Sequence, residues 1–112
     1  MKILEQNINK ADLDNCECVF EGPMVKGVVD VATDTLAIDS ELHADLEKLL
    51  LEEGHKQQNL WGINLWYEDD DEDFVEFDSL INIRPQQNNP GRDVSDEDIQ
   101  KKIIEVVNKW VN

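Results

Sequence analysis

Short stretches of alternating apolar and polar residues predict two β-hairpins in this chain. The first joins residues 24–31 (MVKGVVDV) to residues 35–39 (TLAID) through a turn at 32–34. The second joins residues 59–67 (NLWGINLWY) to residues 74–83 (FVEFDSLINI). Each strand has one apolar face, and the initial MKIL forms a further short strand. We therefore expect a mostly antiparallel sheet of about four or five strands.

The apolar faces of the second hairpin also predict its register, because cross-strand partners must lie on the same face. The resulting pairs are Tyr67–Val75, Leu65–Phe77 and Trp61–Ile81. A slip by one residue would bury Glu76 and Asp78, at a high cost in solvation free energy. In this register residues 70–72 form a three-residue tip, and one of these acids is expected to take a left-handed conformation.

Two segments have the apolar spacing of amphipathic helices. The first helix is predicted to begin at the N-cap pair Asp39-Ser40 and to end at Gly54. The second is predicted to begin at Ser95. Antiparallel hairpins combined with such helices are typical of α+β proteins. We therefore expect a single α+β domain over residues 1–112, with its two main helices packed on one face of the sheet.

The charge balance limits the partners that this chain can have. It contains 26 acidic and 10 basic residues, a net charge of −16. Such a surface repels nucleic acids and anionic membranes, so we expect no partner of either kind. The absence of an apolar run of about 18 residues, and of a secretory signal, predicts a cytoplasmic protein. Cys16 and Cys18 are too close for good disulfide geometry and are expected to be free thiols.

The face of the second hairpin that points away from the helices carries the candidate site. Its polar side chains, with one from the proline-rich loop that follows, are Asn64, Glu76, Asp78, Asn82, Arg84 and Arg92. Carboxylates, amides and arginines together can orient a small polar or anionic ligand, since arginine is suited to bidentate contact with an anion. These residues form the predicted ligand-binding set. The alternative is a solvated sheet face with cross-strand ion pairs.

Four apolar residues are expected on the same outer face, namely Leu60, Trp66, Phe74 and Leu80. Apolar side chains there indicate that the face is partly covered, either by the loop over 84–93 or by a second subunit. A homodimer formed through this face is therefore one predicted arrangement, typical of an interaction domain. A small-ligand-binding protein or an enzyme stays open as the alternative, centred on Asp78, Asn82, Arg84 and Arg92.

The six consecutive acids from Glu68 to Asp73 raise the question of a cation site. Calcium takes about six to eight oxygen ligands and usually requires a glycine to turn the backbone. The stretch has no glycine, so only weak binding of divalent cations is expected. His43 and Glu47 lie one helical turn apart, but two ligands are too few, and His43 is expected to be exposed. No metal centre and no cofactor are predicted, because no zinc spacing, phosphate-binding loop or dinucleotide motif is present.

Three longer runs resemble a known protein family, namely LHADLEKLLLEEG (42–54), LWGINL (60–65) and EFDSLINIRP (76–85). They are similar to those of a group of short bacterial and archaeal proteins classed as a domain of unknown function. The resemblance extends from Met24 to the end, about four-fifths of the chain. Members resemble one another in an acidic, variable stretch between the last two runs and in an N-R or G-R pair after the proline, here Gly91-Arg92. The resemblance implies no activity, cofactor or partner.

Overall fold

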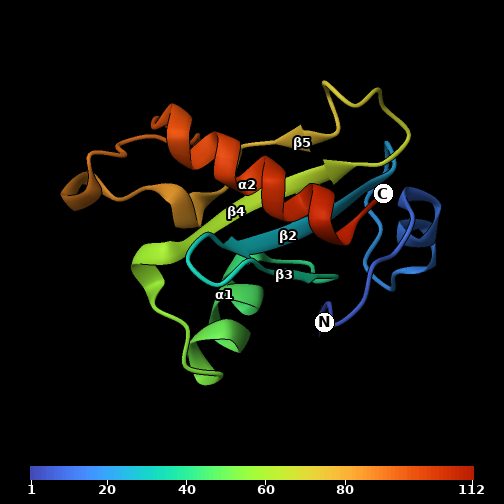
Figure 1. Ribbon diagram of the computed structural model, residues 1–112, viewed down its shortest axis with the longest axis horizontal. Coiled ribbons are helices and arrows are strands. Elements are labelled where there is room, and N and C mark those ends of the chain that lie inside the picture. The colour runs from blue at the N-terminus through green and yellow to red at the C-terminus, as the bar shows by residue number, and fades with distance from the viewer.

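A five-stranded sheet runs through the centre of the molecule in the computed structural model, which describes residues 1–112 (Figure 1). The strands follow the order β1-β3-β2-β4-β5, and all neighbouring strands are antiparallel. Their bounds are β1 Lys2–Ile3, β2 Met24–Asp30, β3 Thr35–Ile38, β4 Leu60–Trp66 and β5 Val75–Glu76. The predicted α+β class and the antiparallel sheet are confirmed.

The long pairing of β2 with β4 forms the centre of this sheet. It extends from Met24 opposite Trp66 to Asp30 opposite Leu60. On its other edge β2 pairs with β3, which confirms the first predicted hairpin. The β2–β4 pairing therefore joins the two hairpins into one sheet, a connection that neither hairpin predicts alone.

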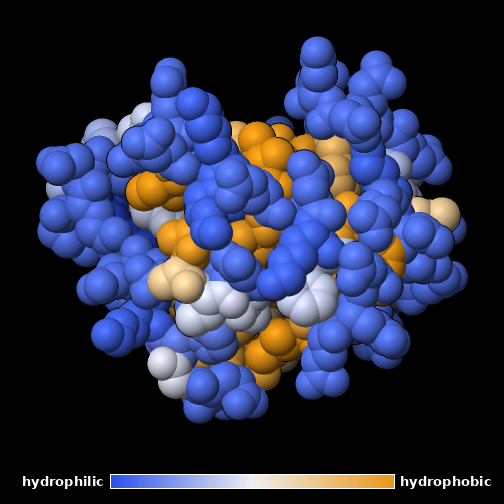
Figure 2. Space-filling model, in the orientation of Figure 1, coloured by the Kyte–Doolittle hydropathy of each residue, from blue (hydrophilic) through white to orange (hydrophobic).

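Two α-helices and four short 3₁₀ turns complete the fold. The α-helices are α1 (His43–Glu52) and α2 (Glu97–Trp110), and the turns are η1 (Lys10–Asn15), η2 (Gln57–Asn59), η3 (Leu80–Asn82) and η4 (Pro85–Gln87). No helix is both long and apolar enough to cross a membrane. Figure 2 shows hydrophilic side chains over most of the face on which α2 lies, as expected from the large acidic excess.

Both α-helices begin slightly later than predicted, because the expected cap residues make other contacts. Asp96 caps α2, and its Oδ1 accepts the N–H of Asp98 at 2.8 Å. The N–H of the predicted cap, Ser95, instead donates to the carboxamide of Asn89 in the preceding loop. At α1 the carboxylate of the predicted cap, Asp39, accepts hydrogen bonds from the backbone N–H groups of Glu17 and Cys18. α1 therefore has no side-chain cap.

The two α-helices pack on opposite faces of the sheet, so the prediction of one shared face is wrong. Leu46 and Leu50 of α1 pack against one side of the strands, on Val28, Ala37 and Leu60. α2 packs on the other side, in a larger cluster that contains Val25, Val29, Leu36, Ile38, Trp61, Ile63 and Leu65. Figure 1 shows α2 in front of β2 and β4, with α1 away from it and below β3. The central strands are apolar on both faces, and each face therefore needs its own cover.

The second hairpin is shorter than predicted and has a shifted register. Leu65 lies opposite Val75 and Asn64 opposite Glu76, two positions from the predicted pairing. Because the shift is even, each paired side chain keeps its predicted face. β5 ends at Glu76, and the predicted strand over 77–83 is instead an extended segment followed by η3. The alternating pattern predicted too long a strand because it continues into η3, where Leu80 and Ile81 belong to a 3₁₀ turn.

The acidic connection between β4 and β5 is a wide loop rather than a three-residue tip. Two successive turns form this loop. In the first, the N–H of Asp69 donates to the carbonyl oxygen of Trp66 at 3.1 Å, and in the second, the N–H of Asp73 donates to that of Asp70 at 2.9 Å. None of its residues has a positive φ, so the predicted left-handed acid is absent. Two turns spread the reversal over more residues, and no position needs a left-handed conformation.

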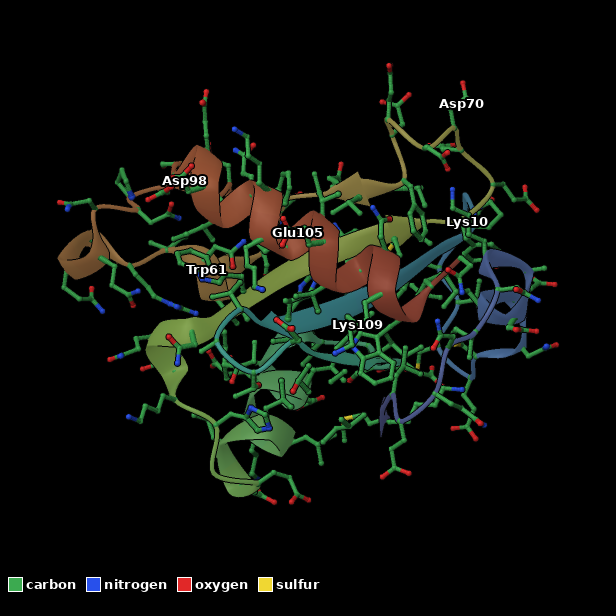
Figure 3. The ribbon with its side chains drawn as sticks, viewed as in Figure 1. Lys10, Trp61, Asp70, Asp98, Glu105 and Lys109 are labelled. Atoms are coloured by element: carbon green, nitrogen blue, oxygen red, sulfur yellow. The ribbon has the colours of Figure 1, made fainter.

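Lys10 holds this acidic loop against the body of the protein. Its Nζ binds Asp71 and lies 4.3 Å from the centre of the Phe74 ring. Figure 3 shows Lys10 beneath the loop that carries Asp70. Phe74 is buried in the cluster on the α2 side of the sheet, so it does not lie on the predicted outer face.

Candidate functional site

A groove of about 630 Å³ opens on the side of the sheet that carries α1. β2 and β4 form its floor, the first turn of α1 forms one wall, and the segment after β5 forms the other. Four of the six predicted ligand-binding residues line it, namely Asn64, Glu76, Asp78 and Arg92. Its volume is in the range of small-molecule sites, about 300–1,000 Å³. The predicted outer face is therefore a groove that α1 covers in part.

Asn64 lies on the floor of this groove with one hydrogen-bonding atom unused. Strand pairing places it between Lys26 of β2 and Glu76 of β5. Its Nδ2 donates to Glu76 Oε1 at 2.7 Å and to the carbonyl oxygen of Asp78 at 3.3 Å. Its Oδ1 accepts no hydrogen bond, although the residue is only 6% exposed. A buried unpaired polar atom costs about 1–3 kcal/mol, which a donor from outside the chain would recover.

His43, at the start of α1, is buried in the wall of the groove, so the prediction of an exposed histidine is wrong. Its Nε2 lies 2.8 Å from the carbonyl oxygen of Ile63. A carbonyl only accepts, so Nε2 carries the proton and the neutral ring keeps a lone pair on Nδ1. Burial lowers the pKa of His43, against the opposing effects of the Ile63 carbonyl and the Asn64 carboxamide. The neutral ring therefore adds a second acceptor to the groove.

Two cations and two carboxylates line the groove, so its local charge balances on a strongly acidic molecule. Arg92 Nε donates to Asp78 Oδ1 at 2.7 Å in an exposed ion pair. Lys26 Nζ donates to the carbonyl oxygen of Glu41 at 2.9 Å. The carboxylate of Glu76 accepts hydrogen bonds from Asn64 Nδ2 and Trp66 Nε1. Anions are therefore not repelled from the groove as strongly as from the rest of the surface.

Apolar side chains form the walls of the groove around this polar floor. They are Met24, Leu42, Trp66, Leu80 and Ile81. Leu42 is 56% exposed and Leu80 is 67% exposed. Trp66 is half-buried, and its Nε1 donates to Glu76 Oε1 at 3.2 Å. An apolar lining with a few placed polar groups is typical of a site for a small organic molecule.

Asn82 and Arg84, the other two predicted site residues, are buried and serve the fold. The carboxamide of Asn82 binds both the N–H and the carbonyl oxygen of Gly62 in β4. Arg84 donates through Nη2 to the carbonyl oxygen of Leu60, and its guanidinium lies 4.7 Å from the centre of the Trp61 ring. β5 ends before it reaches this part of β4, so the two side chains satisfy the backbone groups of the open strand edge.

The predicted group of Asp78, Asn82, Arg84 and Arg92 therefore does not converge in one pocket. Asp78 and Arg92 meet at the groove, whereas Arg84 is 3% exposed and lies 3.8 Å from Glu47 Oε2, at ion-pair distance. Burial lowers the pKa of Arg84, and Glu47 opposes this shift. A guanidinium enclosed in this way cannot reach an anion in the groove.

The acidic loop and the two cysteines are the other groups that the sequence raised for a possible chemical role. No group of three or more histidine, cysteine, aspartate or glutamate side chains is arranged to hold a metal ion. Cys16 and Cys18 are free thiols, as predicted. Burial and the carboxylate of Asp39 raise the pKa of the Cys16 thiol, which keeps it protonated at neutral pH. Since the thiolate is the nucleophile, this cysteine is not activated for catalysis.

Residues 2–110 match the model of a protein family described as Protein of unknown function (DUF5674). The chain belongs to this family. The match includes β1 and the N-terminal segment, so it is longer than the resemblance that starts at Met24. No curated protein and no solved structure matches the chain. The function of DUF5674 is unknown, so a function for this chain is inferred from the chemistry of the groove.

Several residues of the groove lie outside the predicted ligand-binding set. Met24 and Lys26 belong to the first hairpin, and Leu42 and His43 belong to the first helix. Met24, Lys26 and Leu42 fit regular structural patterns with no local sign of a binding role, and the sequence raises His43 only as a metal ligand with Glu47. The pairing of β2 with β4 brings Met24 and Lys26 to the candidate site, and the contact of His43 with Ile63 brings the start of α1 there.

Proposed function

We propose that this protein is a small-ligand-binding domain whose site is the groove between the first turn of α1 and the β4–β5 pair. The observation that carries this proposal is the unused Oδ1 of Asn64, a buried acceptor on the floor of the groove. The apolar walls, which include Met24 and Trp66, would hold the body of the ligand. A donor on the ligand would pair with Asn64, while Asp78 and Arg92 stand at the edge.

The indole N–H of Trp66 offers a direct test by two-dimensional proton–nitrogen NMR. L-phenylalanine, phenethylamine and hydrocinnamate are titrated separately into the labelled protein. Binding in the groove is expected to shift the Trp66 indole signal. The indole signals of Trp61 and Trp110 should stay in place, because neither residue lines the groove. L-leucine, isoamylamine and isocaproate form a second series of probes, and the proposal fails if no probe of either series moves the Trp66 signal.

A matched pair of variants locates the binding site. Ala44 lines the groove, whereas Ala11 is exposed and does not line it. Ala44→Phe is expected to fill the groove and abolish the shift of the Trp66 signal. Ala11→Phe adds the same side chain elsewhere and should leave the titration unchanged. Equal effects of the two variants would show that the probes bind outside the groove.

Self-association is a second candidate function, supported by the exposed leucines beside the groove. Leu42 and Leu80 are both more than half exposed. Exposed apolar groups of this kind are typical of interfaces, and a homodimer would cover them. The net charge of −16 opposes association, so a dimer is expected to strengthen as salt screens this charge. Light scattering at low and high salt tests this. A monomer mass for the parent in both conditions excludes the dimer, and Leu80→Lys is the comparison in which the proposed contact is disrupted.

A cytoplasmic location and weak cation binding at residues 68–73 stay predictions from the sequence. Titration calorimetry with calcium tests the second one. Charge attraction alone predicts a small, non-saturating heat that disappears as salt is added. A saturable heat that survives added salt would instead show a specific cation site.

A further inference from the structure

We infer that the ligand of this groove is a free α-amino acid with an apolar side chain, an inference that rests on the proposed function. The groove places hydrogen-bond acceptors beside hydrogen-bond donors, and His43 contributes to both groups. An α-amino acid carries an ammonium and a carboxylate on the same carbon atom. This zwitterion can satisfy the acceptors and the donors together.

The acceptors of the groove are Asn64 Oδ1 and His43 Nδ1. Asn64 Oδ1 accepts no hydrogen bond within the protein, and His43 directs Nε2, not Nδ1, at the Ile63 carbonyl oxygen. Two neighbouring acceptors require a group with at least two N–H donors. An ammonium has three, whereas a hydroxyl has one. The carboxylates of Glu76 and Asp78 line the same groove and favour a positively charged group.

The donors are backbone N–H groups in the first turn of α1. The N–H of Leu42 donates to Ser40 Oγ at 3.3 Å, and that of Asp45 donates to the Leu42 carbonyl oxygen at 3.2 Å. The N–H groups of His43 and Ala44 find no acceptor, because α1 has no side-chain cap. Free N–H groups and the helix dipole together favour a bound anion. The carboxylate of the ligand would therefore lie at this helix terminus.

The nearby cations support the carboxylate in this position. Lys26 and Arg92 both line the groove. Arg92 uses Nε for its ion pair with Asp78, so its two Nη atoms are free to donate. A helix terminus and two surface cations would be an unspecific combination without a further feature. The buried acceptor on Asn64 makes this a site for one molecule with both charges.

The apolar walls indicate which side chain the amino acid carries. Met24, Trp66 and Leu80 surround the polar floor with apolar surface. A charged ligand side chain would be desolvated against these apolar walls, at a cost in binding free energy. Leucine, methionine or phenylalanine would bury its side chain against these walls.

Matched compounds test the inference on the full chain by the shift of the Trp66 indole signal. L-phenylalanine is compared with phenethylamine, which lacks the carboxylate, and with hydrocinnamate, which lacks the amine. L-leucine is compared in the same way with isoamylamine and isocaproate. In at least one series, the amino acid is expected to bind at least about tenfold more tightly than both analogues, about 1.4 kcal/mol.

The outcomes separate this inference from the proposed function. If an amine or an acid binds as tightly as its amino acid in both series, the inference is overturned while the groove remains a binding site. If no compound of either series shifts the Trp66 signal, both the inference and the proposed function fail.

Two variants connect the selectivity to the acceptors. Asn64→Ala removes Oδ1 and is expected to reduce the affinity for the amino acid to that of the matching acid. His43→Gln keeps a donor for Ile63 but alters the second acceptor, so it should also reduce the preference for the amino acid over the matching acid. Asn108→Ala, at an exposed position on α2, is the control. Unchanged Trp61 and Trp110 signals show that each variant is folded, and an unchanged selectivity in both groove variants contradicts the inference.

Discussion

The carboxamide of Asn82 takes the place of a β-strand beside Gly62. Its Oδ1 accepts the N–H of Gly62 at 2.8 Å, and its Nδ2 donates to the carbonyl oxygen of Gly62 at 3.0 Å. The same Nδ2 also donates to the carbonyl oxygen of Arg92 at 3.0 Å. One buried side chain thus closes the edge of β4 and holds the loop that brings Arg92 to the groove.

Asn82→Ala is expected to destabilise the protein strongly, because it leaves buried backbone groups of β4 without partners. Each such group costs about 1–3 kcal/mol, so the free energy of unfolding should fall by about 2–4 kcal/mol. Asn108→Ala, at an exposed helix position, should change it by less than about 0.5 kcal/mol. Denaturant unfolding of both variants measures the difference. Similar values for the two would contradict the strand-replacing role of Asn82.

Arg84 and Arg92 are expected to respond differently to the same substitution. Arg84→Lys loses the planar fork that reaches Leu60 and stacks on Trp61, so it should cost about 1–3 kcal/mol of stability. Arg92→Lys alters only an exposed ion pair with Asp78 and should cost less than about 1 kcal/mol. The midpoints of guanidinium chloride unfolding provide the comparison. A larger loss for Arg92→Lys would reverse the assignment of the two arginines.

His43 should make stability depend on pH in the mildly acidic range. Burial lowers its pKa in the folded state, whereas the unfolded chain keeps the ordinary histidine pKa of about 6.5. Below that pH the unfolded state binds more protons, so the free energy of unfolding falls as pH decreases toward the folded-state pKa. Above it this contribution is constant.

Comparison of the parent with His43→Gln isolates this effect. The parent's stability relative to the variant is expected to be smaller at about pH 5.5 than at about pH 7.5. Denaturant unfolding at the two pH values measures it. A difference between parent and variant that does not change with pH would show that burial leaves the pKa of His43 unshifted.

Lys10 should control the titration of Asp71 in the acidic loop. The hydrogen bond and charge of Lys10 lower the pKa of Asp71. Lys10→Met is therefore expected to raise this pKa toward the ordinary aspartate value of about 3.9. Because the folded-state pKa is depressed, the associated stability is present above the unfolded-state pKa and is lost as pH falls through the folded-state pKa. Carbon-13 NMR titration of the carboxyl groups measures the change.

Lys109→Met is the matched control for this titration. Lys109 lies near Asp34, on a different part of the surface from the acidic loop. Its removal should leave the pKa of Asp71 unchanged. An equal shift of the Asp71 pKa in both variants would mean that the general loss of positive charge, and not the contact with Lys10, is responsible.

The sequence predicted the first hairpin and the existence of both main helices, because alternation and helical spacing are properties of neighbouring residues. It placed Asn64, Glu76, Asp78 and Arg92 in the candidate site, and all four line the groove. It also placed Asn82 and Arg84 there, where the structure uses them to satisfy β4. Polar residues on one predicted face look alike in sequence whether they bind a ligand or a backbone.

The composition and the local patterns already determined the α+β class, the strong acidic charge and the separation of apolar from polar faces. They left open the pairing of β2 with β4, and they gave a wrong register for β5 and a wrong, shared face for α1 and α2. Those features depend on contacts between residues far apart in the chain, where burial of both sheet faces outweighs any local preference. The groove exists because of these contacts: it lies where α1 leaves part of one sheet face open, over the unused acceptor of Asn64.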